Sequence, residues 1–284
     1  MSTAAKLAAS AAALVVLFGG AALAGAAIGP DRDVDVASTE PRGHSEVASA
    51  AEHVAEPRAL RGLAIAEDGL RVVVEHAELR RGREETLRFR IVDERGETVR
   101  DFDVEHEKRM HLILARRDLS NFQHLHPEQA ADGSWSVSVR LAEAGSYRLF
   151  ADFSHDGEPQ TLANDLRVDG TADLRPLPAP EPTAVSDGGY QVRLEAVEAR
   201  PGQEADLRFT ITKDGVPVET EPYLGAGGHL VALRDGDLAF LHVHPTDDSV
   251  RFAATFPTEG RYRLFLQFKH ERRVQTVAFT QEVS

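Results

Sequence analysis

Short runs in which apolar and polar residues alternate, separated by turn-forming residues, fill the chain from about residue 60 onward. In the first half of this region the pattern predicts β-strands at residues 70–74, 86–92, 110–115, 122–126, 135–141, 147–153 and 162–168. Residues 94–96 and 131–133 each end in Gly and supply turns between strands. Several short strands at this spacing are typical of an all-β sandwich.

The second half of the region repeats the first. Residues 110–127 align without a gap with residues 228–245, and each copy is followed by Gly-x-Tyr-x-Leu-Phe, at 145–150 and 260–265. A duplicated unit of about 100 residues with short strands is typical of the immunoglobulin-like sandwich, and Gly-x-Tyr matches the tyrosine corner that begins strand F. We therefore predict an all-β protein with two tandem immunoglobulin-like β-sandwich domains after an N-terminal apolar helix and a disordered tether.

The N-terminal segment predicts export. Residues 7–29 carry no charge and follow Lys6. A run of this length can span a bilayer, and Ala22-Leu23-Ala24 also fits the cleavage site of a secretory signal peptide. Both interpretations remain open, and both place the rest of the chain outside the cytoplasm, either anchored to the cell membrane or secreted.

Composition sets the remaining boundaries. Residues 30–58 have few large apolar side chains, which is typical of a disordered tether, and four prolines between 172 and 182 form a semi-rigid spacer. The predicted segments are a signal peptide or membrane anchor at 1–29, a tether at 30–58, a sandwich at 59–170, a Pro-rich linker at 171–186 and a sandwich at 187–284.

Charge and cysteine content exclude some functions. The chain has 284 residues, no cysteine, and a net charge of −14. Without cysteine it has no disulfides and no thiolate metal site. The excess of acidic residues argues against nucleic-acid binding, which requires a basic surface. No protein partner is indicated by the sequence.

Histidine carries the candidate chemistry. Eight of the 12 histidines fall into two equivalent sets, namely His111, His124, His126 and His155, and His229, His242, His244 and His270. A hairpin in each copy places the first histidine opposite the His-x-His pair, and strand F ends beside the start of strand C in this fold. Each set is therefore expected to gather at one end of a sheet. Side-chain alternation along the predicted strands suggests that the histidines point to the inner side, at an open mouth of the sandwich.

Two interpretations of the histidines remain. Converging imidazoles would repel when protonated and need partners when neutral, and a metal ion removes both problems. Imidazole ligands, no cysteine and only two methionines favour copper or zinc. We therefore predict a metal site in each domain. The alternative is a hydrogen-bonded cluster that fixes each hairpin onto strand F, in a cell-surface structural or interaction module.

A resemblance points the same way. Residues 107–112, Glu-Lys-Arg-Met-His-Leu, are followed by Asp-Leu-x-x-Phe-x-His-x-His-Pro at 118–127. This motif resembles a group of uncharacterised bacterial exported or membrane-anchored two-domain β-sandwich proteins, which are loosely tied to copper and other heavy-metal handling. The similarity covers both β-domains but not the tether. The second copy departs from the motif, because Ala-Gly-Gly at 226–228 replaces Lys-Arg-Met at 108–110.

No catalytic pattern accompanies the histidines. The sequence offers no Ser/His/Asp arrangement, phosphate-binding loop or paired-carboxylate signal, and His124-x-His126-x-Glu128 lacks the second half of the cupin metal motif. We therefore predict no enzyme. The predicted function is binding or delivery of copper or zinc outside the cytoplasm, with contact to the membrane through residues 7–29 if these stay attached.

Overall fold

Alternation along each strand separates core from surface. In β2 (Leu70–Val74), Leu70 and Val72 are buried while Arg71 and Val73 are exposed. The computed structural model describes residues 60–195, 198–247 and 249–284, without the side chains of His242 and His244. The predicted anchor and tether lie outside these ranges. No helix within the described ranges is long and apolar enough to span a membrane.

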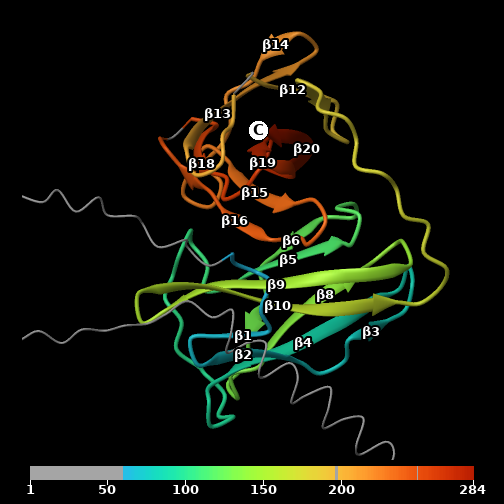
Figure 1. Ribbon diagram of the computed structural model, residues 1–284, viewed down its shortest axis with the longest axis vertical. Coiled ribbons are helices and arrows are strands. Elements are labelled where there is room, and N and C mark those ends of the chain that lie inside the picture. The colour runs from blue at the N-terminus through green and yellow to red at the C-terminus, as the bar shows by residue number, and fades with distance from the viewer. Residues whose placement is uncertain (1–59, 196–197, 248) are drawn as a thin grey trace, which may run out of the picture. The chain divides into compact units, whose positions relative to one another are not determined.

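The first sandwich is built from two five-stranded sheets (Figure 1). One has the order β1-β2-β4-β8-β7 and the other β3-β10-β9-β5-β6. The remaining strands of this sandwich are β1 (Ala66–Glu67), β3 (Glu78–Leu79), β4 (Glu84–Val92), β5 (His111–Arg116), β6 (Gln123–Leu125), β7 (Glu128–Gln129), β8 (Trp135–Arg140), β9 (Gly145–His155) and β10 (Glu158–Val168).

The second sandwich repeats this arrangement. Its sheets have the orders β11-β12-β13-β18-β17, with β14 beside β13, and β16-β15-β19-β20. The strands are β11 (Thr183–Val185), β12 (Tyr190–Leu194), β13 (Glu204–Lys213), β14 (Val216–Pro217), β15 (His229–Arg234), β16 (Phe240–His242), β17 (His244–Pro245), β18 (Arg251–Thr255), β19 (Gly260–His270) and β20 (Arg273–Val283).

These strand orders identify the fold. The sheet β2-β4-β8-β7 corresponds to strands A, B, E and D of an immunoglobulin-like domain, and β10-β9-β5-β6 corresponds to G, F, C and C′. The Tyr147 hydroxyl donates to the Glu143 carbonyl at 2.9 Å, and the Tyr262 hydroxyl donates to the Thr258 carbonyl at 3.1 Å. Both tyrosine corners are therefore present. The predicted fold class, all-β with two immunoglobulin-like sandwiches, is confirmed.

Three apolar clusters form the core of the described residues, and one of them joins the two sandwiches. One cluster fills each sandwich, and Leu112 and Leu114 of β5 belong to the cluster of the first. The third, here called the interdomain core, lies within the compact unit Glu56–Ser284. It joins the sheet of the first sandwich that contains β5 and β9 to the sheet of the second that contains β15 and β19, and we call these two sheets the C-F sheets. Its buried residues are Ile113, Ala115, Leu119, Phe150 and Ala163 from the first sandwich and Val231, Leu233, Leu238, Phe240 and Phe265 from the second. The C-F sheets are therefore covered on both faces.

The linker is shorter than predicted. We expected it to extend to residue 186, but β11 (Thr183–Val185) pairs with β12 and forms part of the second sandwich. The Ser186 amide also donates to the Tyr190 carbonyl at 2.9 Å. The prolines end at Pro182, and β-pairing begins with the next residue. The second sandwich therefore starts at Thr183 rather than at residue 187.

Candidate metal centre

The first two histidines meet where β5 pairs with β6. His111 is the first residue of β5, and the register pairs Ile113 with His124. His111 is 3% exposed, and its Nδ1 atom lies 3.0 Å from Nε2 of His124. His126 follows β6 and completes the group, with its ring centroid 5.1 Å from that of His111 and 4.8 Å from that of His124. Three predicted ligands of the first domain thus come together.

A histidine of the second sandwich joins them. His229 begins β15, and its ring stacks on that of His111 with centroids 5.7 Å apart and an interplanar angle of 7°. Its centroid is 4.8 Å from that of His124. One ring nitrogen from each of His111, His124 and His229 lies within 4.8 Å of the other two. The cluster therefore draws on both domains.

His106 is a member that the sequence analysis missed. Its ring centroid lies 5.8 Å from that of His229 and 6.2 Å from that of His111. A tight turn carries it, in which Glu105 and Lys108 exchange backbone hydrogen bonds of 2.8 and 3.0 Å. His106 and Glu107 have φ angles of 48° and 66°, which non-glycine residues seldom adopt. We call His106, His111, His124, His126 and His229 the histidine cluster.

His111 and His124 each have one ring nitrogen that faces away from the other ring, here called the outer nitrogen. Hydrogen bonds at these two outer nitrogens indicate where the protons lie. His124 Nδ1 is 2.7 Å from Gln267 Oε1, and His111 Nε2 is 3.1 Å from the Glu105 carbonyl oxygen. Both oxygens are acceptors, so with the Gln267 amide in this orientation both outer nitrogens donate. A neutral imidazole has only one N–H. His111 Nδ1 and His124 Nε2 then face each other with two lone pairs, and a proton or a metal cation between them is needed.

Burial disfavours the proton. It lowers the pKa of His124 to about 3, and positive charge on His111 and His126 would lower it further. Burial also lowers the pKa of His126 to about 4, with contributions from His111 and Lys108. The Nε2 atom of His126 is buried and has no hydrogen-bond partner among the described residues. Near neutral pH His124 and His126 therefore present unprotonated nitrogens, which are what a metal ion binds.

The cluster lies on the outer face of its sheets, so our expectation of inward-pointing histidines was wrong. His111 alternates with Leu112 and shares its face with Ile113, which packs in the interdomain core. His229 likewise shares a face with Val231. All six residues of β5 are buried because the second sandwich covers this face. Alternation therefore could not distinguish the inner side from the outer.

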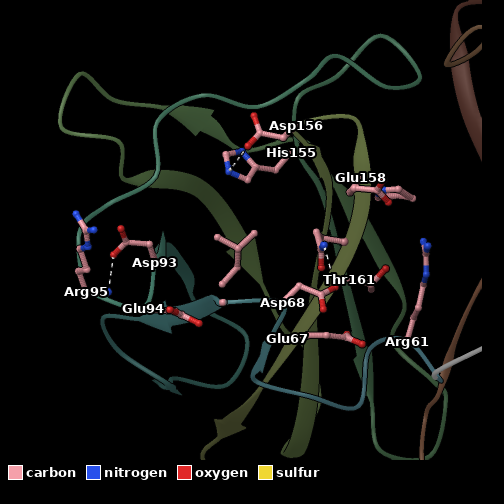
Figure 2. A pocket seen from close by; sticks show the side chains of 14 residues that line it. Arg61, Glu67, Asp68, Asp93, Glu94, Arg95, His155, Asp156, Glu158 and Thr161 are labelled. Carbon is pink, nitrogen blue, oxygen red and sulfur yellow. Dashed lines mark hydrogen bonds and ion pairs between the residues drawn. The ribbon is translucent and has the colours of Figure 1, made fainter.

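His155 lies apart from the cluster. It ends β9 and shares parity with Phe153 of the first sandwich's own core, whereas His111 is paired with Asp152. Its Nδ1 atom is 3.0 Å from the Asp101 carbonyl oxygen. Figure 2 shows it beside Asp156 at the rim of a cavity of about 790 Å³, where six of the fourteen lining residues are Asp or Glu. The expected meeting of His155 with His111 was therefore wrong.

One member of the second predicted set, His270, also lies apart from the cluster. His270 Nδ1 lies 2.8 Å from the Tyr190 hydroxyl oxygen, on the inner side of the second sandwich. His242 ends β16 and His244 begins β17, and these strands belong to different sheets. The side chains of His242 and His244 lie outside what the structure describes. Among the described side chains, His111, His124, His126 and His229 of the two predicted sets lie in one cluster shared by both domains, and His155 and His270 lie outside it.

Comparison with known proteins identifies a family. A family model described as "Domain of unknown function (DUF8832)" matches twice, at residues 64–170 and 183–284. No curated protein matches the chain.

Of the solved structures, the Escherichia coli adhesin FdeC is 13% identical with a TM-score of 0.28, and the alignment covers 78% of this chain and 66% of that one. The Yersinia pseudotuberculosis adhesin InvE is 10% identical with a TM-score of 0.25, covering 75% and 58%. The Lin-41 filamin domain is 14% identical with a TM-score of 0.26, covering 37% and 97%.

Proposed function

Because this chain belongs to the DUF8832 family, whose description names no activity, we propose its function from the histidine cluster. We propose that the protein binds one divalent copper or zinc ion between its two immunoglobulin-like domains. The ligands come from His111, His124, His126 and His229, and His106 is within reach of the same site. Residues 7–29 support the further proposal that this binding, or delivery of the ion, takes place outside the cytoplasm.

The observation that supports the proposal is that His111 Nδ1 and His124 Nε2 face each other and neither nitrogen carries a proton. Their facing nitrogens are 3.0 Å apart, and metal–nitrogen bonds are about 2.0–2.1 Å long. One ion can therefore contact both. Each ring donates its other N–H to an oxygen, of Glu105 or of Gln267. Metal-binding histidines usually make this second hydrogen bond, which orients the ring and fixes its tautomer.

The available ligands favour copper(II) or zinc(II). Both ions accept imidazole nitrogen, whereas copper(I) stores rely on sulfur ligands. The chain has no cysteine, and Met110 is buried in the core of the first sandwich, 1% exposed. No thioether of the described residues therefore adjoins the cluster. The preference between copper and zinc is decided by the titration below.

A second candidate function has one observation in its favour. The His124–Gln267 contact of 2.7 Å joins the first sandwich to the second without any ion. The cluster would then serve only to attach the domains, and the protein would be a cell-surface structural or interaction module. Metal titration separates the two candidates, because only the first requires an ion to bind with defined stoichiometry.

Metal titration of the full-length protein tests the proposal. We expect one equivalent of Cu(II) or Zn(II) to bind at pH 7, measured by isothermal titration calorimetry and by elemental analysis after desalting. The double substitution His124→Ala/His126→Ala should abolish that equivalent, because it removes two of the clustered ligands. The matched control His155→Ala/His270→Ala removes two histidines outside the cluster and should leave binding unchanged. Two equivalents of metal, or a loss of metal in the control, would contradict a single shared site.

Gln267 gives a separate test of the proposed ligand geometry. Its amide oxygen accepts from His124, while its amide nitrogen donates to Thr276 Oγ1 at 3.2 Å. Gln267→Leu keeps the side chain's approximate size but removes that acceptor. We expect about 10- to 100-fold weaker metal binding, as for other substitutions behind a metal-binding histidine. Unchanged affinity in calorimetry would show that this hydrogen bond does not orient His124 for an ion.

A further inference from the structure

The two domains meet through equivalent positions. Phe122 stacks on Phe265 with ring centroids 4.1 Å apart and an interplanar angle of 7°. In the repeat, Phe240 corresponds to Phe122 and Phe150 corresponds to Phe265. Phe240 and Phe150 also touch, with centroids 5.6 Å apart. Residue i of one domain thus contacts residue j of the other, and the reverse contact also occurs, as in a twofold-symmetric dimer.

The histidine cluster lies where this approximate symmetry axis passes. His111 and His229 are equivalent residues, and their rings stack directly on each other. A residue that touches its own equivalent must lie near the axis. The interdomain core continues the pattern, because Ile113 and Val231 are also equivalent and both belong to it. The cluster and the interdomain core are therefore parts of one interface.

We infer that metal binding and docking of the two domains are a single coupled equilibrium. The ion binds histidines of both domains near the symmetry axis and so stabilises the docked state. This inference rests on the proposed function. Separating the domains would remove His229 from His111 and His124 and would expose the interdomain core. An ion that binds only the docked state stabilises that state by mass action. By reciprocity, docking raises metal affinity by the same factor by which bound metal favours docking. A variant that lowers the docked fraction therefore lowers the apparent metal affinity in proportion to that fraction.

Phe265→Ala tests the coupling without altering a histidine. It removes the ring that stacks on Phe122 and should loosen docking. We expect metal affinity to fall by about 5- to 150-fold, the usual range for coupled sites. Val139→Ala is the matched control, because Val139 is 3% exposed inside the first sandwich and is not part of the interdomain core. Its metal affinity should equal that of the wild type.

Docking can be measured directly in the full chain. The protein has no cysteine, so Val73→Cys and Val216→Cys, at positions 37% and 64% exposed, allow one fluorophore on each sandwich. In the Phe265→Ala background we expect energy transfer to differ from that of the wild-type background without metal and to return to it at saturating Zn(II). Leu233→Asp, in the interdomain core, provides a stronger perturbation for comparison.

The outcomes separate the two hypotheses. If the wild-type chain binds no Zn(II) or Cu(II), the proposed function fails. A second outcome is that it binds one equivalent, but both interface variants bind with wild-type affinity and their energy transfer does not respond to Zn(II). That outcome contradicts the coupling of metal binding to docking and leaves the proposed metal site intact. Circular dichroism of each variant confirms that the sandwiches are folded, and Phe265→Ala decides the result if Leu233→Asp is unfolded.

Discussion

Acidification from pH 7 to pH 5 is expected to lower the free energy of unfolding of the metal-free protein by about 2 kcal/mol for each of two histidines. The folded-state pKa values of His124 and His126 are about 3 and about 4, below the ordinary value of 6.5, mainly because both are buried. Between these values and 6.5 the unfolded chain takes up protons that the folded chain does not. Stability is therefore full above pH 6.5 and falls as the pH drops toward 4.

Urea unfolding at pH 7, 6 and 5 measures this dependence. His124→Gln/His126→Gln removes both titrating groups and should flatten the change in unfolding free energy over the same range. Saturating metal should also protect the wild type near pH 7 and lose that effect on acidification, because the ligands must be deprotonated to bind. An equal pH dependence in the wild type and the double variant would contradict the assignment to these histidines.

Replacing Arg116 by Met is expected to lower the free energy of unfolding by about 3–5 kcal/mol, because it leaves a buried carboxylate without its counter-ion. The side chains of Arg116 and Asp118 are 1% and 4% exposed and approach to 2.5 Å. Burial alone would raise the pKa of Asp118, but hydrogen bonds from Arg116, Arg175 and Ser120 hold it far below the ordinary value. Asp118 therefore stays charged, and Met supplies it with no partner.

The second repeat provides the matched control. Arg234 and Asp237 form the equivalent pair, but their side chains are 15% and 40% exposed. Arg234→Met should cost about 1 kcal/mol or less, because the Asp237 carboxylate that it leaves behind is exposed to solvent. The double substitution Arg116→Met/Asp118→Leu should recover much of the loss, since neither charge is left buried. Equal costs for Arg116→Met and Arg234→Met in urea unfolding would show that burial does not govern these pairs.

The fold was predictable because each sandwich follows local rules. Alternation placed the strands, and the tyrosine corners identified strand F, as the Tyr147–Glu143 and Tyr262–Thr258 hydrogen bonds confirm. The ungapped alignment of the repeats is less accurate at one turn. Asp118 pairs with Arg116 and Asp237 pairs with Arg234. The two arginines are at matching positions of that alignment, but the two aspartates are not. Turn lengths differ while the flanking strands keep their register.

The site was less predictable because it depends on how the domains meet. The hairpin register correctly brought His111, His124 and His126 together. The run His-Leu-Ile-Leu-Ala in β5 is apolar on both faces, which is the pattern of a sheet covered on both sides. That signal would have indicated an outer partner for the histidines. His106 was missed because Leu224 occupies its place in the second copy, and a comparison of repeats discards whatever only one copy contains.

Joining both halves of the symmetric interface in one chain also makes assembly of the cluster insensitive to dilution. Two separate chains with the same surfaces would associate only above a threshold protein concentration. A covalent linker instead keeps each domain exposed to its partner at an effective concentration on the order of millimolar. The linker here is short and proline-rich, ending at Pro182. In dilute solution the protein would then keep all five histidines of the cluster together, and the proposed binding of an ion there would not depend on how many copies are present.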